Sequence, residues 1–86
     1  MSPKRAPQHS ARYKRFLAAL RQARKNAGLT QVEVAKKLRN HNSYTSKSEN
    51  GERRVDVVEL VDFCQIYGIS VSQLLQSCGL EALPSS

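Results

Sequence analysis

The side chains that most often carry out catalysis are few and scattered in this sequence. The two histidines are His9, near the N-terminus, and His41, in a polar stretch, and neither has a cluster of carboxylates or nucleophiles around it. General acid–base chemistry needs such partners within hydrogen-bond reach. We therefore expect no catalytic residue and no enzymatic activity, and His41 is more simply a capping residue or a neighbour of phosphate.

The two cysteines, Cys64 and Cys78, fall in segments with helical periodicity. They lack Cys or His partners at metal-ligand spacing, so they predict neither a zinc site nor a disulfide framework. A redox-sensing pair and two buried thiols are the remaining interpretations. Buried thiols are favoured, because a reactive cysteine needs an electropositive, accessible setting and the segment around Cys64 has no lysine or arginine. No metal and no cofactor is expected.

Basic side chains are numerous and unevenly placed along the chain. The 86 residues include 14 Lys plus Arg and 7 Asp plus Glu, which gives a formal charge of +7. Positions 1–48 hold 12 of the basic residues with Glu33 as the sole acid, whereas positions 55–86 hold no Lys or Arg. Such a field attracts nucleic acid and supplies affinity through counterion release. Charge alone leaves a solvated basic surface as an equally good interpretation.

Length and hydropathy limit the class of protein. A chain this short is expected to form one compact domain, without room for a small-molecule ligand. No stretch approaches the roughly 18 apolar residues of a membrane span, and the basic start lacks the apolar run of a secretory signal. We expect a cytoplasmic protein without membrane contacts.

Capping and turn signals divide the chain into five helical segments, with no convincing strand. Residues 1–9 carry two prolines and almost nothing apolar, which predicts a flexible basic arm, and residues 81–86 are expected to form a tail. The helical domain is predicted over residues 10–80. Its helix starts are marked by Ser10 and by three capping boxes, which pair Thr30 with Glu33, Asp56 with Glu59, and Ser70 with Gln73.

The middle of the chain predicts two short helices joined by a turn. The helix that begins after Thr30 is expected to end at Leu38, and the turn follows over residues 39–42. Asn40 is expected to adopt the left-handed backbone there, because Asn tolerates positive φ. Ser43 to Glu49 is predicted as a short polar helix. The helix from Asp56 to Gly68 is apolar on most faces and is expected to be the central buried element.

The run GLTQVEVAKKLRNHNSYTSKSENGERRVDVVELVDFCQIYGISVSQLL resembles the helix-turn-helix domain of lambda-repressor-like and Cro-type (xenobiotic-response-element-like) regulators. That family commonly begins G-L-T/S-Q, has Glu-x-Gly after its third helix, and ends in G-hydrophobic-S-hydrophobic-x-x-L-L. The resemblance covers roughly residues 12–78 and implies an all-α, compact five-helix DNA-binding domain. Its second and third helices would form the helix-turn-helix, with residues 42–49 as the recognition helix in the major groove.

The resemblance also implies roles for individual residues. Arg24 and Glu49 match positions that often form a partly buried ion pair between the first helix and the end of the third. Base reading in double-stranded DNA falls to Asn42, Ser43, Ser46 and Lys47, because Asn can bond adenine and Lys can donate to guanine. Phosphate contacts fall to Gln31, Tyr44, Asn50, Arg53 and Arg54.

Three residues depart from the pattern of the family. Arg39 replaces a frequent turn glycine, and Thr45 and Ser48 replace apolar residues that usually face the core. We expect the recognition helix to be weakly anchored as a result and to become firmly ordered on DNA.

A single recognition helix reads too few base pairs to select one site, so the resemblance implies a symmetric homodimer on an inverted repeat. Apolar residues near the C-terminus are the expected interface. The alternative is that Leu80 and Leu83 fold back over their own subunit. The interface residues are Leu74, Leu75, Cys78, Leu80 and Leu83.

The sequence thus predicts a DNA-binding transcriptional repressor with a palindromic operator. The main alternative is an antitoxin that binds a toxin protein and represses its own operon, because antitoxins of this fold look alike in sequence. RNA binding is less favoured, since only five Phe and Tyr residues are present to form a stacking platform.

Overall fold

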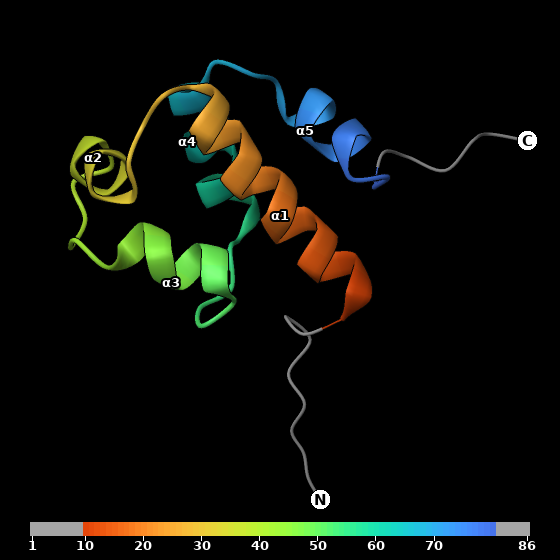
Figure 1. The fold of residues 1–86 in the computed structure, drawn as a ribbon, viewed down its shortest axis with the longest axis horizontal. Coiled ribbons are helices and arrows are strands. Elements are labelled where there is room, and N and C mark those ends of the chain that lie inside the picture. Colours follow the sequence, from red (N-terminus) through yellow and green to blue (C-terminus); the bar gives the residue numbers. More distant parts are fainter. Residues whose placement is uncertain (1–9, 81–86) are drawn as a thin grey trace, which may run out of the picture.

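The computed structural model describes residues 10–80, which contain five helices joined by turns and loops (Figure 1). No strand occurs within this range, and the all-α, five-helix fold class is confirmed. The predicted arm (1–9) and tail (81–86) lie outside the described residues. The helices are α1 (Ala11–Asn26), α2 (Gln31–Lys37), α3 (Tyr44–Asn50), α4 (Val57–Tyr67) and α5 (Val71–Ser77).

The helix starts follow the local sequence signals. Ser10 accepts a hydrogen bond from the Tyr13 N–H, and each of the three predicted capping boxes forms both of its reciprocal hydrogen bonds. A cap of this kind stabilises a short helix by about 1 kcal/mol, because it satisfies N–H groups that have no partner inside the helix. Local chemistry therefore fixes where α1, α2, α4 and α5 begin.

The hydrophobic core lies between α1 and the other helices. α1 contacts α3, α4 and α5, and α2 contacts α3 and α4. Leu20 of α1, Val34 of α2 and Phe63 of α4 are fully buried at its centre. Tyr44 and Tyr67 both stack on Phe63, with ring centroids 5.8 and 6.0 Å away. α3 is thus held to the rest of the domain by an aromatic stack as well as by α1 and α2.

The turn after α2 places its left-handed residue one position earlier than the sequence predicts. Arg39 has φ +56°, and Asn40 is not in the positive-φ region. The reason is positional: the Asn40 N–H donates to the Ala35 carbonyl at 2.9 Å, which is the closing bond of a Schellman ending and requires the residue before it to be left-handed. Arg39 therefore occupies the turn-glycine position at a steric cost that glycine avoids.

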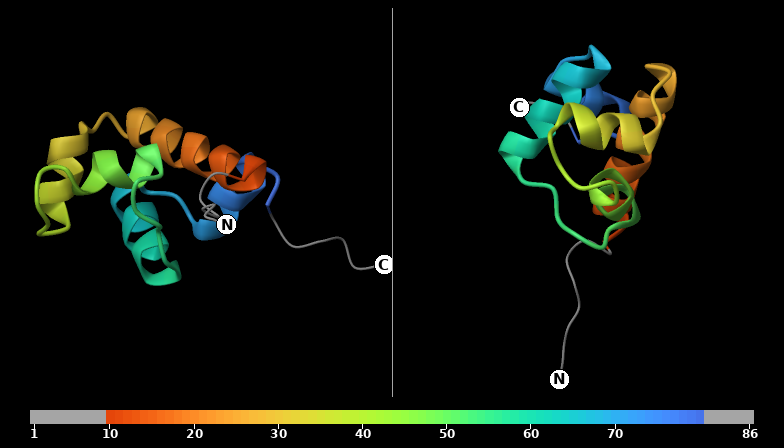
Figure 2. Two further views of the ribbon diagram at one scale, coloured as in Figure 1. Left: turned by 90° about the horizontal axis from the view of Figure 1, so that it is seen from below. Right: turned by 90° about the vertical axis from the view of Figure 1, so that its left-hand side faces the viewer.

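α4 is less buried than its apolar composition predicts. Phe63, Cys64 and Tyr67 in its second half are buried, but Val57 and Val58 in its first turn are 76% and 68% exposed. Figure 2 shows the first turns of α4 extending away from the other helices. Burial depends on which neighbours reach a helix, and no other helix within residues 10–80 covers this end.

Both cysteines are buried, as predicted, and are free thiols. Burial raises the pKa of Cys64, so that thiol stays protonated. Among residues 10–80, no helix is long and apolar enough to cross a membrane, and no group of side chains could hold a metal ion.

Candidate nucleic-acid interface

α2 and α3 lie together at the side of the molecule remote from α5 (Figure 1). The turn between them directs α3 along the outside of the domain. α3 begins at Tyr44, one residue later than predicted, and ends at Asn50, with Gly51 left-handed at φ +82°. Two helices joined by a tight turn are the arrangement that can set one helix into the major groove while the other crosses the backbone.

The outer side of α3 and the turn before it present polar side chains to solvent. Asn42, Ser43 and Lys47 are exposed, and Ser46 is partly exposed. The Ser46 hydroxyl donates to the Ser43 carbonyl at 3.1 Å, and the Ser43 hydroxyl lies 3.0 Å from His41 Nδ1. Lys47 forms no ion pair with any described residue. The four predicted base-reading residues thus lie together, with Asn42 and Lys47 free to donate to an edge of DNA.

The inner side of α3 faces the core through two polar residues. Thr45 and Ser48 are fully buried, as their positions in the family pattern predict. The Ser48 hydroxyl donates to the Tyr44 carbonyl at 2.8 Å and accepts from Arg53 Nη1 at 2.9 Å. Thr45 Oγ1, by contrast, has no hydrogen-bond partner among the described residues. An unpaired buried hydroxyl lowers the stability of the fold by about 1–3 kcal/mol. That α3 is weakly anchored stays a prediction.

Tyr44 is a core residue rather than an exposed phosphate ligand. Its exposed fraction is 6%, and its ring lies between Phe63 and the Arg53 guanidinium, which is 4.5 Å from the ring centroid. Tyr44 was predicted to contact phosphate, and its burial in the core argues against that role. The first residue of α3 points inward because α4 supplies an aromatic surface for it to pack on.

Arg24 of α1 and Glu49 of α3 form an ion pair inside the domain. Arg24 Nε donates to Glu49 Oε2 at 2.7 Å, and Nη2 donates to Oε1 at 3.2 Å. The Glu49 side chain is fully buried, and that of Arg24 is 10% exposed. The hydrogen bond to Glu49 raises the pKa of Arg24 despite the opposing effect of burial. The pair is bidentate, which is the strongest geometry for such a contact.

Glu49 also holds the start of α2. Gln31 Nε2 donates to Glu49 Oε1 at 2.9 Å, and Arg24 Nη1 donates to the Leu29 carbonyl at 2.9 Å. One carboxylate therefore joins α1, α2 and α3, and it fixes the recognition helix relative to the partly exposed Gln31.

The loop between α3 and α4 contains two arginines with different surroundings. Arg53 pairs with Glu59 and covers the Tyr44 ring, so its guanidinium is engaged within the fold. Arg54 is exposed, and its guanidinium lies 4.9 Å from the centroid of the Tyr13 ring. Asn50 is also exposed. Among the predicted phosphate-binding residues at the end of α3 and in the following loop, Arg54 and Asn50 are therefore the ones that remain available to phosphate.

Two of the five residues predicted to form the dimer interface are buried inside the subunit. Leu74 and Cys78 are 1% and 8% exposed, because α5 packs them against α1 and α4. Leu75 and Leu80 are partly exposed, and Leu83 lies outside the described residues. The most exposed large apolar side chains of residues 10–80 are instead on α4, at Val57 and Val58.

Comparisons with known proteins agree with this geometry. Residues 15–76 match a family described as a helix-turn-helix domain. A solved structure, the XRE-family like protein from Pseudomonas syringae pv. tomato str. DC3000, is 45% identical with a TM-score of 0.76, over 83% of this chain and 87% of that chain. No curated protein matches the sequence.

Proposed function

Because the chain belongs to the lambda-repressor-like and Cro-type family of helix-turn-helix DNA-binding regulators, we propose that it is a transcriptional repressor that binds a palindromic operator as a homodimer. The observation that carries the proposal is the division of α3 into two sides. Its inner side is fixed in the core through Tyr44 and Glu49, and on its outer side Lys47 is exposed and forms no ion pair with any described residue. A helix held in this way can present side chains to base edges.

Specificity in this proposal comes from Asn42 and Lys47. Asn42 can form two hydrogen bonds with adenine, and Lys47 can donate to O6 and N7 of guanine. Ser43 and Ser46 are smaller and less selective. Arg54, Asn50 and Gln31 flank this group and would bind phosphate, which fixes the register of the helix without reading sequence. Arg54 is suited to this role because its stacking on Tyr13 limits the freedom of its side chain.

Two subunits are needed because one short helix contacts only a few base pairs. In a two-fold dimer the half-sites lie about 34–36 Å apart, so both recognition helices enter the same side of the duplex. Since Leu74 and Cys78 are buried, the apolar side chains that remain for pairing among the described residues include the partly exposed Leu75 and Leu80 and the exposed valines of α4. Burial of such apolar side chains between two copies would stabilise the dimer.

Selection of binding sites from random DNA tests the proposal, followed by affinity measurements on the selected site. We expect an inverted repeat, and affinity that falls by several powers of ten between about 50 and 200 mM salt if six or more phosphates are engaged. Asn42→Ala and Lys47→Ala should each cost about 1–3 kcal/mol of binding and relax base preference at one position. Arg54→Ala should weaken all sequences alike.

A matched control is Asn26→Ala, an exposed asparagine of α1 that faces α5 rather than α3. It should leave affinity and base preference unchanged. Unaltered specificity in both the Asn42 and Lys47 variants would show that α3 does not read the bases.

The antitoxin alternative keeps the same DNA-binding side and adds a protein partner. The exposed first turn of α4 is open to such a partner as well as to a second copy, because Val57 and Val58 are apolar side chains that no other described helix covers. Replacement of both valines by Ser distinguishes the two ideas. Loss of the dimer indicates pairing between copies, whereas an unchanged dimer that no longer binds a toxin encoded by a neighbouring gene indicates an antitoxin.

A further inference from the structure

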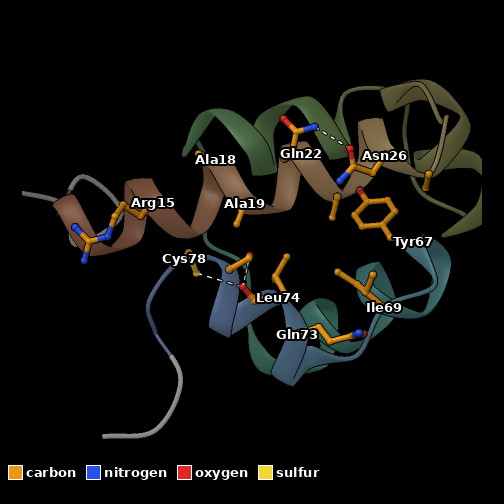
Figure 3. A pocket seen from close by; sticks show the side chains of 13 residues that line it. Arg15, Ala18, Ala19, Gln22, Asn26, Tyr67, Ile69, Gln73, Leu74 and Cys78 are labelled. Carbon is orange, nitrogen blue, oxygen red and sulfur yellow. Dashed lines mark hydrogen bonds between the residues drawn. The ribbon is translucent and has the colours of Figure 1, made fainter.

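A groove of about 680 Å³ lies between α1 on one side and α5 with the end of α4 on the other (Figure 3). It exists because the side of α1 that faces α5 carries short side chains, Ala18, Ala19 and Ala23, opposite Leu74 and Cys78. Its volume is in the range of pockets that hold small molecules, about 300–1,000 Å³. From the length of the chain we expect no room for a small-molecule ligand. The groove, however, is large enough to hold one.

Tyr67 at one end of the groove has a polar atom that the protein leaves unsatisfied. Its side chain extends from the last residue of α4 towards α1 beside Asn26 (Figure 3). Tyr67 is 6% exposed, and its hydroxyl has no hydrogen-bond partner among the described residues. Buried hydroxyls are nearly always paired, so an orphan in the wall of a pocket indicates a missing partner.

The charges around the groove differ between its two ends. Arg15 lies at the end opposite Tyr67 and is the one charged residue among the described residues that line the groove (Figure 3). At the other end, burial and then the nearby charge of Glu49 raise the pKa of Tyr67, so its hydroxyl is neutral. An anionic group is therefore favoured beside Arg15 and disfavoured beside Tyr67, where a neutral oxygen fits instead.

We propose that this groove binds an elongated monocarboxylic acid that carries a neutral oxygen at its far end. The carboxylate pairs with Arg15, the apolar body lies along the alanines of α1, and the far oxygen forms a hydrogen bond with the Tyr67 hydroxyl. Arg15 and Asn26 are eleven positions apart on α1, which corresponds to about 16 Å along the helix. A straight-chain hydroxy acid of about ten carbons spans this length. The proposal concerns the free protein and does not depend on DNA binding.

The test is a titration of the 15N-labelled full chain with 10-hydroxydecanoate, followed by amide chemical shifts without DNA. We expect saturable binding of one molecule per chain, with shifts centred on Ala19, Leu74 and Ser77. Decanoate, which lacks the far oxygen, should bind about three- to tenfold more weakly, as the loss of one neutral hydrogen bond implies. Decane-1,10-diol, which lacks the carboxylate, should also bind more weakly.

Three variants connect the binding to individual residues. Tyr67→Phe should bind 10-hydroxydecanoate and decanoate equally, and it should fold normally because the hydroxyl that it removes has no partner among the described residues. Arg15→Gln should weaken both acids severalfold, while the matched control Arg12→Gln, an exposed arginine of α1 outside the groove, should not. Ala19→Leu should fill the groove and abolish binding.

Several results would overturn the proposal. These are the absence of saturable shifts up to millimolar ligand, an equal loss of binding in Arg12→Gln and Arg15→Gln, and a preference for the hydroxy acid that survives Tyr67→Phe. The same holds if dilution of the protein alone moves the amides of the groove, because a second copy of the chain would then be its occupant.

Discussion

Glu49→Gln should destabilise the domain more than any other near-isosteric substitution on its surface or in its core. The Glu49 side chain is fully buried, and its partner Arg24 is 10% exposed, so water screens their interaction little. Glutamine keeps the size of the side chain and an acceptor for Gln31, but it leaves the Arg24 charge uncompensated inside the protein. Loss of one member of a buried pair costs about 3–5 kcal/mol.

This cost is large relative to the total stability of so small a domain. For 86 residues, the free energy of unfolding is about 4–13 kcal/mol. Glu49→Gln therefore removes about a quarter of it or more, and α3 loses its main connection to α1 and α2. Urea unfolding followed by far-UV circular dichroism near neutral pH measures the change as a shift of the midpoint at constant slope.

Two further variants separate the loss of charge balance from other effects. Glu52→Gln changes the same side-chain type at an exposed position and should alter stability by less than about 0.5 kcal/mol. The double variant Arg24→Met with Glu49→Leu removes both charges and should be more stable than Glu49→Gln alone. The reasoning is refuted if Glu49→Gln costs less than about 1 kcal/mol, or if the double variant is no more stable than the single one.

Three other substitutions test features of the fold by the same unfolding measurement. Arg39→Gly should raise stability by about 1 kcal/mol, because glycine adopts φ +56° without steric cost; a lower midpoint would mean that the Arg39 side chain contributes more than its backbone strain removes. Thr45→Val should raise stability by about 1–3 kcal/mol, since it removes an unpaired buried hydroxyl at nearly constant volume, and a decrease would reveal a hydrogen bond of Oγ1. Partial burial raises the pKa of Glu59, but the hydrogen bonds from Arg53 and the Asp56 backbone lower it further, so the folded pKa lies below the unfolded value near 4.5. The stabilisation by Glu59 is then complete above about pH 4.5 and is lost as the pH falls through the folded pKa. Glu59→Gln should therefore reduce the loss of stability at acid pH. An unchanged dependence of stability on acid pH would contradict the assignment.

The parts of the fold that depend on neighbouring residues could be predicted from the sequence. Capping boxes at Thr30, Asp56 and Ser70 fixed three helix starts, because each involves residues only three positions apart. The prediction of the left-handed residue in the turn was wrong by one position. The Schellman ending after α2 requires a positive φ at the residue that follows its C-cap, and that residue is Arg39. Residue type alone favoured Asn40.

Features that depend on distant segments could not be predicted from composition. The apolar run of α4 predicts burial, but its first turn extends beyond the helices that would cover it. Tyr44 is drawn inward by the ring of Phe63, 19 positions away, and no local signal indicates that contact. The pairing of Arg24 with Glu49 across 25 positions was accessible only through the resemblance to a family. The groove between α1 and α5 requires knowledge of two facing helix surfaces.

The two sides of α3 have a consequence for how such a protein diverges. Tyr44, Thr45, Ser48 and Glu49 are committed to the interior, whereas Asn42, Ser43 and Lys47 contribute little to it. Substitutions at the outer positions are therefore nearly neutral for folding, and duplicated copies of the gene can drift through many combinations there while the scaffold stays intact. If the proposed function is right, the same separation makes these three positions suitable for retargeting the domain to new DNA sequences.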